Sequence, residues 1–214
     1  MAPGNDVTDR IVQAALALAS ERGWRKVSLA DIASRAELTL LEVYQAFPSK
    51  TAILPRLIGS TDEAVLSQGP AAGADSPRDR LFDVVMRRFD ALQARRAGTV
   101  AILRDLAYDP ASLACLSARL ARSMAWMLEA AGISSSGCEG WIKVKGLALV
   151  YLDALRVWIN DESPDMARTM AAVDRGLRRA EQIARCLPMR SGRAAREPAG
   201  SGPPVEETPP APAV

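Results

Sequence analysis

Apolar residues recur along this chain with the spacing of an α-helix, and this periodicity limits the fold more than any other feature. In residues 7–23 five of them stand at positions i, i+3, i+4, i+7 and i+8, on one helical face: Ile11, Ala14, Ala15, Leu18 and Ala19. Runs of β-branched residues are scarce, whereas alanine, leucine and arginine, which favour helices, abound. The sequence therefore predicts an all-α fold.

Capping residues and prolines divide the pattern into separate helices. Ser28, Thr39 and Ser49 each precede a periodic segment, as N-caps do, because their hydroxyls can accept a bond from a free backbone N–H. Proline suits the first helical position, which needs no N–H, and three Ser-Pro or Asp-Pro pairs begin at residues 76, 109 and 163. The predicted helices span residues 7–23, 29–36, 40–47, 50–67, 77 to beyond 92, 99–107, 110–131, 136–160 and 164–187.

Composition divides the chain into three parts. Residues 68–75 (QGPAAGAD) lack an apolar period and are predicted to be a linker. From Met189 onward the chain holds six prolines and little that could form a core. We therefore predict a three-helix headpiece at residues 7–57, a larger helical bundle for ligand binding and dimerisation at 58–187, and a disordered tail at 188–214.

The residue types present argue against an enzyme. The chain has no histidine, which removes the commonest general base and metal ligand, and it has no carboxylate pair with a reason to be catalytic. Three cysteines without CxxC spacing are interpreted as reduced thiols on helices: Cys115, Cys138 and Cys186. The sequence predicts no catalytic residue, no metal and no cofactor.

The chain is also predicted to be cytoplasmic, without an integral membrane segment. Its start lacks a basic region followed by an apolar one, and its longest apolar run, residues 146–152, is far below the roughly 20 residues of a membrane span. The net charge of +2 neither requires nor excludes a nucleic acid, because a local patch matters more than the total.

Residues 28–36 and 40–47 have the dimensions of a helix-turn-helix, a DNA-reading unit in which the first helix braces the second. The run SLADIASRAELTLLEVYQAFPSKTAIL resembles the N-terminal domain of the tetracycline-repressor (TetR) family. The resemblance covers about residues 7–57, and its matching residues are Ile32, Ala33, Tyr44, Phe47, Pro48, Ser49, Lys50 and Leu54.

This resemblance implies a DNA interface. In that family the positions of Ser28, Thr39, Tyr44 and Lys50 commonly touch phosphates of double-stranded DNA, whereas bases are read from the exposed recognition-helix positions, here Leu40, Leu41, Glu42 and Gln45. Leu41 and Glu42 depart from the family pattern, which usually has a small residue and threonine there. An acid in this helix helps only where it accepts from a cytosine amino group.

The body carries a second resemblance. The segments DPASLACL and WINDESPD (residues 158–165), with Thr169, look like the ubiquinone-biosynthesis lipid-binding family, most specifically at residues 160–169. That family shares the TetR fold, holds an isoprenoid lipid and engages a ring-modifying hydroxylase. The resemblance implies an alternative function that does not involve DNA.

Apolar residues of the body are candidates for a ligand pocket; core is the favoured interpretation for any single one of them, and a pocket is favoured for the set as a whole. They are Leu81, Val85, Phe89, Leu103, Leu106, Leu120, Met124, Met127, Trp141, Leu147 and Tyr151.

The favoured hypothesis is a homodimeric TetR-type transcriptional regulator, a repressor that responds to a small apolar ligand. The alternative is an isoprenoid-lipid-binding accessory protein. Residues 136–160 and 164–187 are predicted to form the dimer contact, helped by Gly146 and Gly176.

Overall fold

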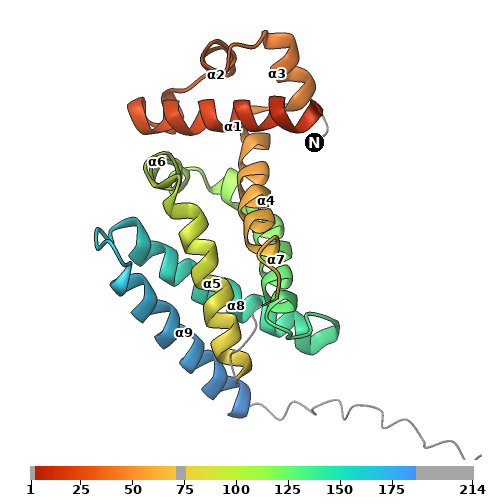
Figure 1. Cartoon of the computed structure of the whole chain (residues 1–214), viewed down its shortest axis with the longest axis vertical. Helices are drawn as coiled ribbons and strands as arrows, with labels where there is room; N and C mark the ends of the chain where they lie inside the picture. Colours follow the sequence, from red (N-terminus) through yellow and green to blue (C-terminus); the bar gives the residue numbers. More distant parts are fainter. Residues whose placement is uncertain (1–2, 71–75, 187–214) are drawn as a thin grey trace, which may run out of the picture.

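A computed structural model describes residues 3–70 and 76–186, and this part of the chain is all-helical, as predicted. Figure 1 shows three helices lying across one end of an elongated bundle. The helices are α1 (Pro3–Arg22), α2 (Leu29–Arg35), α3 (Leu40–Ala46), α4 (Ile53–Leu66), α5 (Pro77–Gln93), α6 (Arg96–Leu106), α7 (Pro110–Ala130), α8 (Gly137–Ile159) and α9 (Ala167–Cys186), with 3₁₀ turns at Trp24–Lys26 and Lys50–Ala52. The predicted tail at 188–214 lies outside the described residues.

Most of the predicted caps are confirmed. Ser28 and Thr39 are the N-caps of α2 and α3, and Ser49 caps the 3₁₀ turn that precedes α4. Before α5 and α7, Ser76 and Asp109 accept from a backbone N–H while proline occupies the first turn. These helix starts are therefore set by local hydrogen bonding that is legible in the sequence.

Several predicted helix starts were wrong. The first helix begins at Pro3 rather than at residue 7, and the fourth begins at Ile53, after the 3₁₀ turn, rather than at Lys50. The last helix begins at Ala167 rather than at Pro164, because Met166 adopts a left-handed backbone (φ 53°) and Ser163 is held by Asp161. The sixth helix begins at Arg96, three residues before the predicted Thr99. The hydrogen bonds of Asp161 to Ser163 and Thr169 account for the late start of the last helix, and a cap-and-proline pattern does not report them.

The headpiece has its own buried core, formed by α1, α2 and α3 with the start of α4. Two residues of α6, Ile102 and Leu106, complete it. Helix α6 approaches α1 closely at Gly98, where an added Cβ would collide with the backbone of Leu16. The headpiece therefore rests directly on α6, which lies under α1 in Figure 1.

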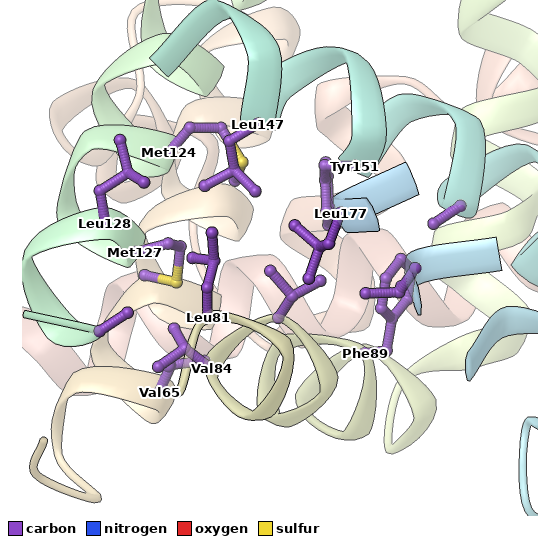
Figure 2. Packing of buried hydrophobic residues seen from close by; sticks show 14 of the residues in the cluster. Val65, Leu81, Val84, Phe89, Met124, Met127, Leu128, Leu147, Tyr151 and Leu177 are labelled. Atoms are coloured by element: carbon purple, nitrogen blue, oxygen red, sulfur yellow. The ribbon is translucent and has the colours of Figure 1, made fainter. Parts of the chain in front are cut away.

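A second buried cluster fills the body (Figure 2). It brings together residues of α4, α5, α7, α8 and α9, and its largest fully buried apolar side chains are Trp158, Phe89, Met124 and Met127. The Phe89 ring stacks on Tyr151 with centroids 5.4 Å apart. The predicted domain boundary at residues 57 and 58 falls inside α4, so this helix belongs to both cores.

A buried ion cluster anchors α4 in the body. Asp62 on α4 pairs with Arg88 on α5, and both side chains are nearly inaccessible to solvent. Ser123 Oγ on α7 donates to Asp62 Oδ1 over 2.5 Å, and Arg119 Nη2 lies 3.4 Å from Asp62 Oδ2. Arg88 also lies over the Tyr151 ring, 5.1 Å from its centroid. One carboxylate on α4 thus connects this helix to α5 and α7, and Arg88 extends the cluster to α8.

Removal of this carboxylate should strongly destabilise the protein. Asp62→Ala leaves the Arg88 guanidinium buried without its counter-ion, which costs about 3–5 kcal/mol in free energy of unfolding. Glu139→Ala, which breaks the solvent-accessible pair with Lys143 on α8, should cost about 1 kcal/mol or less. Chemical unfolding at one protein concentration measures both. Equal losses in the two variants would contradict an anchoring role for Asp62.

Candidate nucleic-acid interface and ligand-binding core

The helix-turn-helix is built from two short helices that each close a capping box. The Ser28 hydroxyl accepts from the Asp31 N–H and the Asp31 carboxylate accepts from the Ser28 N–H, and Thr39 and Glu42 do the same at the start of α3. Such boxes satisfy helix N–H groups from both directions. The two helices therefore have defined starts although each contains only seven residues.

Helix α3 exposes the side chains that were predicted to read bases. Val43 is the buried contact to the headpiece core, whereas Leu40 and Leu41 are 55% and 63% exposed. Tyr44, which was predicted to touch a phosphate, is 70% exposed on the same helix. Glu42 and Gln45 are also exposed. The structure thus brings the predicted base-reading set together on one surface; the role of these residues remains a prediction.

Glu42 is engaged within its own helix. Its Oε2 accepts from the Thr39 N–H and the Thr39 hydroxyl, each over 2.7 Å. The backbone hydrogen bond from Thr39, followed by the side-chain one, lowers the pKa of Glu42, so the group stays ionised. One oxygen of this carboxylate, Oε2, therefore caps the start of α3, and the Thr39 and Ser28 hydroxyls both donate to an acid of their own box.

Lys50 is packed against the headpiece rather than extended into solvent. Its Nζ donates to the Trp24 backbone oxygen over 2.5 Å and lies 4.4 Å from the centroid of the Trp24 ring. Burial lowers the pKa of Lys50, with Asp105 acting in the opposite direction. Lys50 thus holds the 3₁₀ turn before α4 against Trp24, a structural contact that the sequence did not reveal.

Three arginines of the headpiece are neutralised by ion pairs. Arg22 pairs with Asp31, Arg35 with Glu21, and Arg56 with Asp9. Two exposed cations precede α2, Arg25 and Lys26, and their side chains form no ion pair with any described residue. Phosphate neutralisation, which dominates the affinity of most DNA-binding proteins, therefore has few free cations to draw on here.

The predicted ligand-pocket residues divide between several places. Most are buried in the body cluster: Leu81, Val85, Phe89, Met124, Met127, Leu147 and Tyr151 (Figure 2 shows several of them facing one another). Leu103 and Leu120 pack against this cluster with partial exposure. Leu106 belongs instead to the headpiece core, and Trp141 is 63% exposed on α8, so neither was placed correctly. Helical spacing identifies an apolar face but does not say which neighbour covers it.

The ion cluster around Asp62 was missed by sequence reasoning. Its members come from three helices and carry no shared spacing, so the sequence offered no signal for their meeting. Asp62 and Arg88 each interrupt an otherwise apolar helical face, a pattern that can indicate a buried charge but does not indicate its partner. Because Asp62, Arg88 and Ser123 are all buried, they are the main polar feature among these helices of the body.

Residues 160–169 have a structural role at the turn between α8 and α9. Asp161, 1% exposed, accepts from the Ser163 hydroxyl over 2.5 Å and from the Thr169 N–H and hydroxyl over 2.8 and 2.7 Å. Although burial opposes ionisation, the hydrogen bonds from Ser163 and Thr169 together lower the pKa of Asp161 to about 2. The segment that looked most like a lipid-binding signature thus fastens the start of α9.

Asp161 should make stability depend on pH at the acid end. Its folded pKa of about 2 lies below the unfolded value of about 3.9, so its contribution is present above pH 4 and lost as pH falls through 2. Asp161→Asn should lower the free energy of unfolding by about 1–2 kcal/mol at pH 7, and the gap to the parent chain should close between pH 4 and 2. The matched control Glu162→Gln, on the exposed neighbour, should show no such gap. A gap that stays constant down to pH 2 would contradict this role.

The described residues were also compared with the requirements of a metal site and of a membrane span. No group of three or more histidine, cysteine, aspartate or glutamate side chains is arranged to hold a metal ion in the described part. Within the same residues, no helix has the length and apolarity that a membrane crossing demands. Cys115 and Cys138 are exposed free thiols.

Two family models match separate parts of the chain. The model for bacterial regulatory proteins of the tetR family matches residues 11–57, and the COQ9 model matches residues 114–184. The first covers α1 to the start of α4, whereas the second covers most of α7 and the α8–α9 pair. The two matches coincide with the two resemblances stated from the sequence.

Known repressors and solved regulators are similar over longer stretches. The HTH-type transcriptional repressor KstR of Rhodococcus jostii is 26% identical over 155 residues, which cover 72% of this chain and 73% of that protein. The KstR protein of Mycolicibacterium smegmatis is 32% identical over 113 residues, 49% of this chain and 52% of that protein. The crystal structure of a TetR transcriptional regulator from Nitrosomonas europaea is 26% identical, with a TM-score of 0.66, and covers 82% of this chain and 98% of that one.

Proposed function

This chain carries a TetR-family N-terminal domain on a helical body of the same fold, and from that premise we propose that it is a DNA-binding transcriptional repressor. The observation that carries the proposal is the exposed face of α3, in a helix-turn-helix whose two helices each begin with a capping box and which lies within the stretch that matches the family model. The similar proteins include repressors by name, which supports repression over activation. We propose that it acts in the cytoplasm, where its DNA lies.

We propose that the body binds a small apolar effector. The support is its apolar cluster, in which Met124 and Met127 are fully buried and flexible enough to adapt to different shapes. Helix α4 contributes Val65 and Asp62 to this body and Leu54 and Leu57 to the headpiece core. A ligand that repacks the body would therefore act directly on the helix that positions α3.

We further propose that two chains form a symmetric dimer through α8 and α9. On α8, Ile142, Leu149 and Leu152 are exposed and stand on one helical face, with Leu149 70% exposed. Such a stripe suits an isologous contact with a second copy. Gly176 does not support this interface as predicted, because it accommodates Val150 of the same chain. Near Gly146 no atom lies within 4 Å of an added Cβ.

A lipid-binding accessory function in ubiquinone synthesis is the second candidate, favoured by the COQ9 match over residues 114–184. Its most specific segment is accounted for by the Asp161 turn, a structural feature that any protein of this fold could use. The capped and exposed α3 has no evident purpose in such a protein. The regulator therefore has the stronger support.

The full-length protein should bind duplexes from its own promoter region. Lys26→Ala should weaken binding to all duplexes alike and flatten the dependence of log K on log salt by about 1 for each lost phosphate contact. Gln45→Ala should change the order of preference among duplexes. Fluorescence anisotropy at several salt concentrations, with light scattering to count two chains per duplex, measures these effects. If the parent protein binds no genomic fragment at low salt, the regulator function fails.

The occupant of the body should separate the two candidates. A regulator should purify empty or with a loosely held small molecule, whereas a carrier should retain a long chain, because each buried methylene contributes about 0.8 kcal/mol. Leu147→Trp, inside the cluster, should reduce effector response, and Leu113→Trp, exposed on α7, should not. A deletion strain should have normal ubiquinone and raised transcription of a neighbouring operon. A quinone-poor strain with unchanged transcripts would overturn the assignment.

A further inference from the structure

The outward face of α3 is unusually apolar for a surface that is to meet DNA. Leu40, Leu41 and Tyr44 occupy positions i, i+1 and i+4, so they share one side of the helix. More than half of each side chain is exposed. With Leu29 and Ala30 of α2 they border an open apolar hollow of about 490 Å³, whose floor includes Val43 and Phe47.

The hydrogen-bonding capacity of this face is small. Glu42 is the acid that caps α3, and both of its donors belong to Thr39. Among the exposed side chains of α3, that leaves the Gln45 amide, the Tyr44 hydroxyl and the second carboxylate oxygen of Glu42 to bond with base edges. Leu40 and Leu41 have no polar atom with which to contact a base.

The major groove offers apolar side chains one specific target. Each base pair presents hydrogen-bond donors and acceptors there, and thymine alone of the four standard bases adds an apolar group, its C5 methyl. We propose that Leu40 and Leu41 determine operator specificity by packing on thymine methyl groups. This inference rests on the proposed DNA-binding function and deepens it, because it names the chemical group that the recognition helix reads.

The charge distribution supports DNA as the occupant of this face. The exposed cations Arg25 and Lys26 stand just before α2, the helix that supplies Leu29 and Ala30 to the hollow. Few other headpiece cations are free of ion pairs, so phosphate contacts can orient the headpiece but contribute limited affinity. Apolar contacts in the groove then carry a correspondingly large share of the binding free energy.

Deoxyuridine substitution tests the proposal, because it removes the methyl group and leaves every hydrogen-bonding atom of thymine in place. A duplex would first be enriched from an unmethylated random pool with the full-length protein, and each thymine would then be replaced singly. At one or two positions per half-site, affinity should fall about fourfold, which is about 0.8 kcal/mol for one methylene-sized group converted at 1.4 kcal/mol per tenfold. Replacements outside the footprint serve as the internal control.

Protein variants assign the effect to its residues. Leu41→Ala should bind the thymine duplex as weakly as the parent protein binds the deoxyuridine duplex, and it should no longer distinguish the two. Gln45→Ala should keep the methyl effect, and Leu113→Ala, an exposed leucine of the body, should leave binding unchanged. An undiminished methyl effect in both Leu40→Ala and Leu41→Ala would overturn the assignment.

The remaining outcomes separate the inference from the function on which it rests. Tight, sequence-specific binding that is indifferent to every deoxyuridine would overturn the inference and leave the regulator intact. Enrichment only from a pool that contains 5-methylcytosine would show that the methyl group comes from modified cytosine, and would refute the thymine assignment. Failure to enrich any duplex would remove the DNA-binding function itself.

Discussion

The buried carboxylate of Asp62 is the contact on which the arrangement of the two cores depends. It sits on α4, a helix that contributes buried residues to both the headpiece core and the body cluster, and it ties this helix to α5 and α7 through Arg88, Ser123 and Arg119. Burial of charges is costly unless they are paired and hydrogen-bonded, so the register of α4 against its neighbours is narrowly defined. A register shift would separate the charges, whereas apolar contacts alone would tolerate it.

A second contact places the headpiece on the body. Gly98 lets α6 touch the α1 backbone at Leu16, and Asp105 at the other end of α6 accepts from the Arg25 N–H over 2.9 Å. Helix α6 therefore supports the headpiece along its length, while α4 supports it at its end (Figure 1). Any change in the body that moves α4 relative to α6 would tilt α3, which is the mechanical basis on which an effector could control DNA binding.

The recognition helix shows how a short helix can combine stability with an apolar outer face. Its capping box is formed by the Thr39 hydroxyl, just before the helix, and the Glu42 carboxylate, and one side chain, Val43, is buried in the headpiece core. The leucines and Tyr44 are then left to face outward, where neither stability nor folding requires them. Exposed apolar side chains that the fold does not require are candidates for a recognition surface.

The sequence by itself determined the features that depend on near neighbours along the chain. Periodicity identified the helices, hydroxyls and prolines identified most of their starts, and the run around Tyr44 and Lys50 identified the headpiece, because all of these act over a few residues. Only the tertiary structure decided that Lys50 would turn to Trp24 and that Trp141 would lie outside the core. It also decided the meeting of Asp62 with Arg88, since these residues lie on different helices and their pairing depends on packing geometry that no local pattern encodes.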